Sequence, residues 1–465
     1  MTCKYTRKVS VGRIRRPWVA SLLSALFPGA GQIYAGASDR GRRLVFVDLS
    51  LFVLLGITVL FFRTQVLKAW ASLDTLSLIM VGNLLLFSYR AWAAHDAHGL
   101  MARRPGSAQV SRLGVVLVGL VVLVPHVALG YLNVVQYSLI SEVFAPAATT
   151  TTIQGSVTTE PGGQTQSTIP GPVLWDGLER LNILLLGSDV GEGRRDIRTD
   201  TMIVVSIDPE SGESAMISLP RNFSGIDLPE GMGLWDCNCF PQLLNDLYFA
   251  ATQNPDAFPG SGDPGPRAVK ATLGQLLGLD IHYYAMVSLE GFVGIVDALG
   301  GVEIYVPNTI VDETYPHEDG VTIENVVIES GWQHLDGHLA LAYARIRRHA
   351  DDFARMNRQR CVLGAVISQS SPFELLARYG SIAEVLKDTL ETDIPRDRLV
   401  DFIDIVPKVS MDRVGVLAVN RDYVSGTTSG RTYYDQERIR AEAQALIADP
   451  TSGGPSGLAL DELCD

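Results

Sequence analysis

Three long apolar stretches, at residues 44–62, 73–93 and 113–132, dominate the first part of the chain. Each is close to the roughly 20 residues that a helix needs to cross a bilayer. An earlier apolar stretch, 18–36, is interrupted by one proline and three glycines. These breaks predict a re-entrant or helix–turn–helix hairpin rather than a continuous span. We therefore expect a helical membrane region over residues 1–140.

The pattern changes after this region. Residues 141–174 are rich in Thr, Ser, Gly and Pro without an apolar period, which predicts a flexible linker. From 175 to 450, short β-rich runs alternate with amphipathic segments, and both hairpins and crossovers are implied, so we expect a mixed-sheet α/β/α sandwich followed by a flexible tail at 451–465. Strands are expected at 181–189, 202–207, 214–219, 283–287, 302–306 and 414–419, and helices at 241–252, 267–277, 292–299, 337–345, 353–368 and 434–447.

Charge predicts the membrane topology. Basic residues cluster at 4–16, 40–43 and 103–112, and cytoplasmic loops carry such clusters. All three clusters are cytoplasmic only if the 18–36 stretch does not cross. Three spans then place everything after about residue 140 outside the cytoplasm. The protein is expected to be a multi-pass protein of the cell membrane.

Charge also limits the partners of the C-terminal domain. The whole chain has a formal charge of −13, although its first 140 residues hold fifteen basic and only four acidic residues. The remainder is therefore strongly acidic, which argues against nucleic acid as a partner.

Six arginines nevertheless lie between residues 345 and 360, in the run RIRRHADDFARMNRQR. Guanidinium groups bind phosphate oxygens through paired hydrogen bonds and stay charged at physiological pH. A loop or chain reversal could direct Arg345, Arg347 and Arg355 at one diphosphate. The alternative is a solvated, salt-bridged helix surface, which is what most charge runs are.

Two carboxylates stand at the ends of predicted strands, Asp189 after the first strand and Asp200 before the second. Together with phosphate oxygens they would form a hard-oxygen Mg²⁺ site, which commonly uses one or two protein carboxylates. Arg198 and Arg221 lie at neighbouring strand ends, where ligands bind in α/β folds. Alternatively, the two aspartates only cap loops.

The runs NILLLGSD, RTDTMIVVSIDP, SLPRN, LDGHLALAYARIR and DDFARMNRQR resemble the LytR-CpsA-Psr family over about residues 181–447. The resemblance implies an Mg²⁺-dependent extracytoplasmic phosphotransferase, which moves a glycopolymer from a polyprenyl-pyrophosphate carrier to peptidoglycan. It implies an arginine-lined pocket above a hydrophobic tunnel. By the resemblance, Asp189 and Asp200 are metal and catalytic residues, Arg345 is catalytic and binds diphosphate, and the other diphosphate ligands are Arg198, Arg221, Arg347, Arg355 and Gln359.

Two departures from the family pattern leave alternatives open. Asn222 stands where the family usually has an aspartate, and the lysine usual before Asn245 is missing. Either change could lower activity. A polyprenyl-diphosphate phosphatase and a non-catalytic, lipid-carrier-binding regulator are therefore the alternative functions.

Two further expectations concern single residues. Of the five cysteines, four would lie outside the cytoplasm, where disulfides form. We expect at least one disulfide that involves Cys237 or Cys239, with Cys361 as the preferred partner, because Cys237 and Cys239 are only two positions apart. Arg360, outside the family's matched set, is expected to face solvent.

Overall fold

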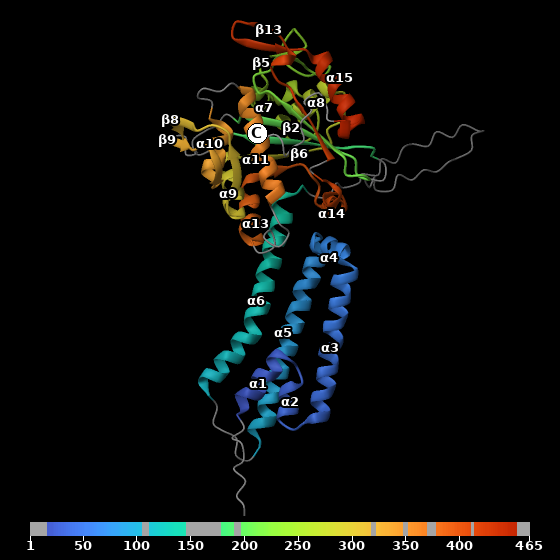
Figure 1. The fold of residues 1–465 in the computed structure, drawn as a ribbon. Coiled ribbons are helices and arrows are strands. Elements are labelled where there is room, and N and C mark those ends of the chain that lie inside the picture. Colours follow the sequence, from blue (N-terminus) through green and yellow to red (C-terminus); the bar gives the residue numbers. More distant parts are fainter. Residues whose placement is uncertain are drawn as a thin grey trace, which may run out of the picture. The chain divides into compact units, whose positions relative to one another are not determined.

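The computed structural model describes residues 16–104, 111–145, 178–189, 197–317, 322–346, 352–369, 378–410 and 413–452 (Figure 1). The chain divides into two compact units, Met1–Tyr137 and Ser138–Asp465. Most of the predicted linker, nearly all of the predicted tail, and Arg347 lie outside the described residues.

Helices form the first unit. Three of them are long and apolar enough to cross a membrane, and they cover the three apolar stretches of the sequence. Their outward side chains, such as Phe46, Leu54 and Leu60, are exposed, as a lipid-facing surface requires. The interrupted stretch forms a short helix–turn–helix, α1 and α2. The helices are α1 (Pro17–Leu26), α2 (Ala30–Tyr34), α3 (Ser38–Phe61), α4 (Arg63–Trp70), α5 (Leu73–Ala102) and α6 (Arg112–Val143).

Glycine and polar side chains attach this helix–turn–helix to its neighbours. A Cβ atom on Gly31 would lie 1.9 Å from the carbonyl oxygen of Ala20, so only glycine allows α1 and α2 to approach this closely. Arg90 of α5 donates to the carbonyl oxygen of Ala25 at 3.2 Å, near the end of α1. The same guanidinium lies 3.7 Å from the carboxylate of Asp48 in α3, which gives that buried acid a partner.

A six-stranded mixed sheet forms the centre of the second unit. Its order is β11-β6-β1-β2-β3-β12. The pairs β1–β6 and β3–β12 are parallel and the other neighbouring pairs are antiparallel, so the predicted mixed sheet is confirmed. The strands are β1 (Leu181–Ser188), β2 (Thr199–Ile207), β3 (Ser214–Leu219), β6 (Tyr283–Ser288), β11 (Leu390–Thr392) and β12 (Val414–Ala418).

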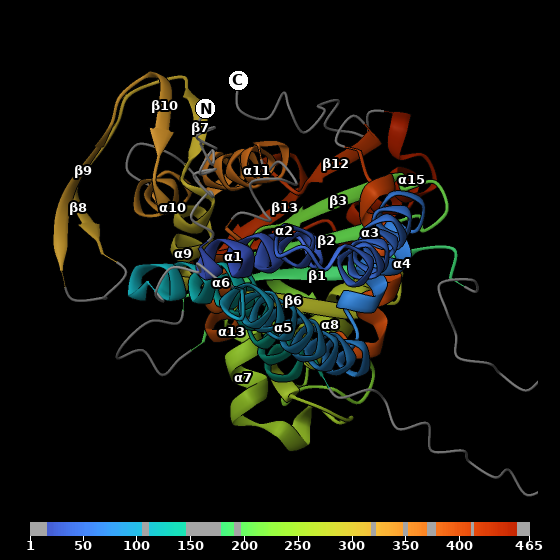
Figure 2. The ribbon, with the colours of Figure 1, turned by 90° about the horizontal axis from the view of Figure 1, so that it is seen from below.

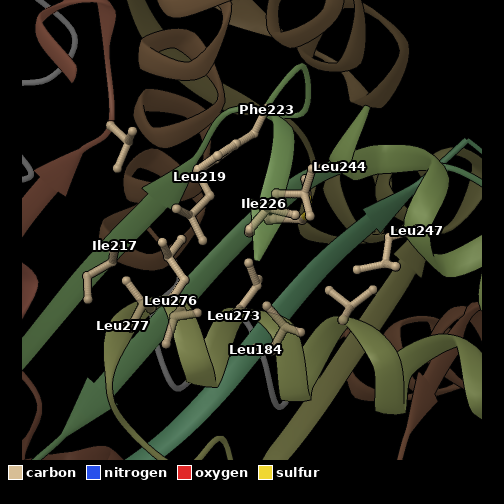
Figure 3. Packing of buried hydrophobic residues seen from close by; sticks show 14 of the residues in the cluster. Leu184, Ile217, Leu219, Phe223, Ile226, Leu244, Leu247, Leu273, Leu276 and Leu277 are labelled. Atoms are coloured by element: carbon tan, nitrogen blue, oxygen red, sulfur yellow. The ribbon is translucent and has the colours of Figure 1, made fainter. Parts of the chain in front are cut away.

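Helices cover both faces of this sheet. Because side chains alternate along a strand, Leu184 and Leu186 of β1 face one layer while Leu185 faces the other. The first layer packs on α8 (Pro264–Leu277) and α15 (Gln436–Ala448), and Figure 3 shows leucines of α8 facing Leu184. The second layer packs on α11 (Asp352–Gln369), and Figure 2 shows α8 and α11 on opposite sides of the strands. The predicted sandwich is confirmed.

A second hydrophobic cluster lies under two small two-stranded sheets. Of their four strands, the sequence predicted only the one at 302–306. The cluster joins these sheets to α9 and α10 and to the buried side of α11. Figure 1 shows β8 and β9 beside α10. The elements are β7 (Val302–Val306), β8 (Ile310–Pro316), β9 (Ile323–Ile328), β10 (Gly331–Leu335), α9 (Leu289–Leu299) and α10 (Gly337–Arg345).

The helix predicted at 241–252 is wrong in its first half. The chain there forms a strand that pairs with β4 and continues into a 3₁₀ turn before the helix begins. In so short a segment, pairing with a neighbouring strand outweighs the helical spacing of the apolar residues. The remaining elements are β4 (Ser224–Asp227), β5 (Cys239–Leu243), α7 (Leu247–Gln253), α13 (Tyr379–Thr389), α14 (Leu399–Ile405), β13 (Val424–Thr428) and β14 (Arg431–Tyr434).

The expected disulfide involving Cys237 or Cys239 is present, but its preferred pairing with Cys361 is wrong, and so is the expected exposure of Arg360. Cys237 bonds to Cys239, with Cα atoms 5.0 Å apart, although the two are only two positions apart. Cys361 is disulfide-bonded too, but with neither of these. Arg360 does not face solvent: it is only 2% exposed, because it lies on the side of α11 that packs into the unit.

Candidate active site

A β-bulge places the first site residue. Gly187 of β1 pairs with Thr201, but the next residue, Ser188, pairs with Thr199, so Asp200 is an extra residue on β2. Bulges of this kind interrupt the regular alternation of a strand and redirect a side chain. The Asp200 carboxylate lines a cavity beside the sheet.

Asp200 is held by residues from two other segments. One Nη atom of Arg221 lies 2.7 Å from both carboxylate oxygens, and the Asn245 amide donates to one of them at 3.0 Å. Burial raises the pKa of Asp200, but the charges of Arg221 and Arg355 and the hydrogen bonds from Arg221 and Asn245 outweigh it. The pKa is therefore below its ordinary value, and the group is ionised at neutral pH.

Asp189 and Arg198 form an adjoining pair beyond the bulge. The backbone N–H of Asp189 donates to the backbone carbonyl of Arg198. In return, the backbone N–H of Arg198 donates to the Asp189 carboxylate at 2.9 Å. The Arg198 guanidinium lies 2.9 Å from Asp246, the residue after Asn245. Because Asn245 contacts Asp200, one polar network extends from Asp189 to Asp200 through this turn.

The cavity has a volume of about 620 Å³, and most of its wall is apolar. One face of α11 forms one side of it, because Arg355, Gln359, Val362, Leu363 and Val366 recur at helical spacing. The opposing apolar side chains come from β1, β2, β6, α9 and α10: Leu185, Leu186, Ile203, Val287, Leu289, Phe292, Ile295, Val296 and Leu341.

Polar side chains make up the rest of this wall. They include Asp200, Arg345, Arg355, Gln359 and Asp312. Arg355 is only 2% exposed, and its charge acts on Asp200. A buried cation beside a mostly apolar cavity is costly unless an anion compensates it.

Arg345, the last residue of α10, is held at the cavity by a tyrosine. It donates to the Tyr315 hydroxyl at 3.3 Å, and its guanidinium carbon lies 5.7 Å from the centre of the Tyr315 ring. Tyr315 is itself buried in β8. This contact fixes the direction of the guanidinium before any ligand binds.

The structure thus brings together most of the residues expected from the sequence. Asp200, Arg345, Arg355 and Gln359 line one cavity, and Arg221 bonds directly to Asp200. Asp189 and Arg198 do not line the cavity wall but join the same polar network. Arg347 lies outside the described residues.

Sequence reasoning missed three contributors. Asn245 was noted only as a retained position, yet it orients Asp200. Tyr315 and Asp312 come from a hairpin whose place beside the arginines no sequence pattern indicated. Asn222, where the family usually has an aspartate, accepts a hydrogen bond from the Tyr434 hydroxyl at 2.9 Å, so it serves packing with the C-terminal hairpin.

The donor set suits a hard cation as well as a diphosphate. Asp200 is ionised and Asp189 is a second carboxylate in the same network. Mg²⁺ prefers oxygen ligands and usually takes only one or two from protein carboxylates, the rest coming from water and substrate phosphates. The residues present therefore fit Mg²⁺ between the carboxylates and a bound diphosphate.

Comparisons with known proteins identify the family of the chain. The model of the LytR_cpsA_psr family matches residues 147–447. The chain is 30% identical over 229 residues to a polyisoprenyl-teichoic acid–peptidoglycan teichoic acid transferase TagU of Oceanobacillus iheyensis, covering 49% of this chain and 62% of that protein. It is also 30% identical to the TagU of Bacillus mycoides over 226 residues, which is 48% of this chain and 64% of that protein.

The matched region therefore spans less than two thirds of the length of these relatives. Among solved structures, the crystal structure of B. subtilis TagV is 23% identical, with a TM-score of 0.42 over 58% of this chain and 98% of that one.

Proposed function

The chain belongs to the LytR_cpsA_psr family, and from that premise we propose that it is a phosphotransferase that moves a glycopolymer from a polyprenyl-pyrophosphate carrier to peptidoglycan. The observation that carries the proposal is the cavity of about 620 Å³, whose mostly apolar wall also includes Arg345 and Arg355. A polyprenyl diphosphate likewise combines an apolar chain with an anionic head.

Arg345 and Arg355 would bind the diphosphate oxygens. Arginine is suited to this task because its planar group can donate two hydrogen bonds to one phosphate. Gln359, one turn further along α11, would add a neutral hydrogen bond.

The transfer itself requires in-line displacement at phosphorus. A hydroxyl oxygen of peptidoglycan would attack the phosphorus that carries the glycopolymer. The bond from that phosphorus to the bridging oxygen would break, and polyprenyl phosphate would leave with the electron pair. The protein mainly positions these groups and neutralises their charge. The proton of the attacking hydroxyl would pass to solvent as the new bond to phosphorus forms.

Asp189 and Asp200 would hold Mg²⁺ beside the diphosphate. The ion would supply positive charge to the phosphate oxygens as they become more negative. Arg221 would keep Asp200 ionised and correctly directed for this role.

The location proposed for this activity is the outer side of the cell membrane. Three helices of the first unit are candidates to cross the bilayer. An odd number of crossings with cytoplasmic basic clusters would place the second unit outside, where peptidoglycan is.

The test uses purified full-length protein with a polyprenyl-diphosphate-linked glycan donor, peptidoglycan and Mg²⁺. Supporting results are polyprenyl phosphate release together with glycan attached to peptidoglycan, loss of both on chelation of Mg²⁺, and a much slower turnover for Asp189→Ala. Release of polyprenyl phosphate without glycan attachment would identify a phosphatase instead. Donor binding without turnover would identify a carrier-binding regulator.

A further inference from the structure

Two histidines and a glutamate meet at the turn end of the β8–β9 hairpin. His317 follows the last residue of β8, Glu324 is the second residue of β9, and His338 is the second residue of α10. None of the three lines the cavity or belongs to the expected phosphate site. Among the described residues, this is the one group of three or more His, Cys, Asp or Glu side chains close enough to hold a metal ion.

The geometry of the group is close to that of a metal site. One ring nitrogen from each histidine and a Glu324 carboxylate oxygen all lie within 4.8 Å of one another. In a tetrahedral Zn²⁺ site with bonds of about 2.0–2.1 Å, neighbouring ligand atoms are about 3.3 Å apart. Small side-chain rotations therefore suffice to bring the three atoms onto one ion.

Contacts within the group already hold it together. His338 Nε2 lies 2.9 Å from Glu324 Oε1, and the rings of His317 and His338 stack with centroids 5.2 Å apart. These two atoms are close enough for an ion pair. Glu324 Oε1 is buried, however, and it accepts no hydrogen bond from the residues that the structure describes. A cation between the two would satisfy it.

The ring of Tyr315 also packs on the group, with its centroid 5.9 Å from that of His338. The backbone supports the arrangement too, because the His317 N–H donates to the carbonyl of Thr322 at 2.9 Å across the hairpin. Two of the ligands are thus on paired strands and the third is on a helix.

We propose that His317, Glu324 and His338 form a binding site for a divalent transition metal, Zn²⁺ in the first instance. Two imidazoles and one carboxylate suit Zn²⁺, whereas Mg²⁺ prefers oxygen ligands alone. The ion ties the β8–β9 hairpin to the start of α10. Because Tyr315 lies two residues before His317 and contacts Arg345, the metal fixes the hairpin that positions this arginine.

The test measures Zn²⁺ itself and does not depend on transferase activity. Full-length protein purified without a histidine tag is depleted of metal and titrated with Zn²⁺ against a chromogenic chelator. Wild type should bind one more Zn²⁺ per chain than the double variant His317→Ala/His338→Ala. Each single change, and Glu324→Gln, should weaken Zn²⁺ binding by more than about a hundredfold. Loss of a residue that only hydrogen-bonds to a metal ligand already lowers metal affinity by about 10–100-fold.

His334→Ala is the matched control. His334 on β10 is an exposed histidine that also pairs with a glutamate, Glu303, at 2.8 Å, but it does not belong to the three-residue group. This variant should keep the wild-type stoichiometry. Equal Zn²⁺ binding by wild type and the double variant would overturn the proposal.

Amide hydrogen exchange supplies the second readout. Zn²⁺ should slow exchange in β8 and β9 of wild type and leave the double variant unchanged. Exchange in the central sheet, measured without metal, should be the same in both proteins and would show that the variant is folded. Zn²⁺-induced protection of β8 and β9 in the double variant would also contradict the site.

Discussion

Asp200 depends on partners that lie 21 and 45 positions away in the sequence. Arg221 and Asn245 keep its carboxylate charged and directed, and a β-bulge aims it at the cavity. At the level of single residues, the site is therefore a set of oriented charges rather than a cluster of reactive groups.

The first prediction concerns Arg345. Its replacement by alanine should weaken binding of a polyprenyl-diphosphate donor by about ten- to a hundredfold, because a charge-assisted hydrogen bond to an ionised ligand contributes about 1.5–3 kcal/mol. Arg345→Lys should recover only part of the loss, since an ammonium cannot donate through a planar fork. Equilibrium binding of the donor measures both effects.

Arg431→Ala is the control for this prediction, since Arg431 is exposed at the start of β14. Arg360, expected from the sequence to be harmless, cannot serve, because it is buried and burial lowers its pKa to about 10. An Arg345→Ala protein that binds donor as tightly as Arg431→Ala would exclude Arg345 from the site.

The second prediction concerns Arg221 and pH. Arg221→Met removes two hydrogen bonds and a charge from Asp200, so the free energy of unfolding at pH 7 should fall by about 1–3 kcal/mol. The Asp200 pKa is lowered in the folded protein, so this stabilisation is present above its ordinary value of 3.8 and is lost as pH falls below it. Denaturant unfolding of both proteins should therefore show a difference that shrinks below about pH 4. A difference that stays constant down to pH 2 would assign the loss to packing.

At the level of elements, α11 combines two functions along one face. Arg355 and Gln359 supply polar groups to the cavity from the first half of α11. Val362, Leu363 and Val366, in its second half, belong to the apolar wall. A helix can do this because residues spaced by three or four positions share a side.

The third prediction tests this division. Val366→Trp should fill part of the apolar cavity and weaken binding of a long-chain polyprenyl diphosphate by at least about tenfold, because the added ring has no room without displacing the lipid. Binding of a short-chain analogue such as geranyl diphosphate should change much less. Calorimetric titration with both ligands measures the contrast.

Ser368→Trp provides the matched control, since Ser368 is an exposed residue near the end of the same helix. It should leave both affinities unchanged. Equal weakening of both ligands by Val366→Trp would mean that the ring disturbs the diphosphate site instead of the lipid wall.

At the level of the whole molecule, the candidate membrane helices and the candidate site lie in different units. The first unit carries three helices suited to a bilayer, and the second carries the site. The short α1–α2 segment ends within the first unit and adds no fourth long helix among the described residues.

The fourth prediction is the topology. A phosphatase reporter joined after Val143, the last residue of α6, should be active, and a fluorescent reporter that folds only in the cytoplasm should be dark there. The reverse pattern is expected after Ala102, the last residue of α5, because Arg103 and Arg104 follow it. Cytoplasmic fluorescence after Val143 would mean that residues 18–36 cross, and the cell-wall function would fail.

Local sequence patterns were enough to predict the elements whose causes are local. Continuous apolar stretches predicted the three long helices, because crossing a bilayer requires an unbroken run. β-rich runs predicted β1, β2 and β3, and the order of strands and helices predicted a mixed sheet with helices on both faces. The motifs also identified Asp200, Arg345, Arg355 and Gln359, which line one cavity.

How distant segments meet depends instead on tertiary packing, which acts between residues far apart in the sequence. Asp200 is redirected by a bulge that depends on the register between β1 and β2, and that register leaves no mark in the sequence. Tyr315 reaches Arg345, and His317 reaches His338, because a hairpin folds onto α10. The burial of Arg360 and the Cys237–Cys239 bond likewise depend on which side of a segment packs inward and how a short loop turns. Residue types and spacing predict which chemistry is present, but packing alone determines which side chains share a cavity.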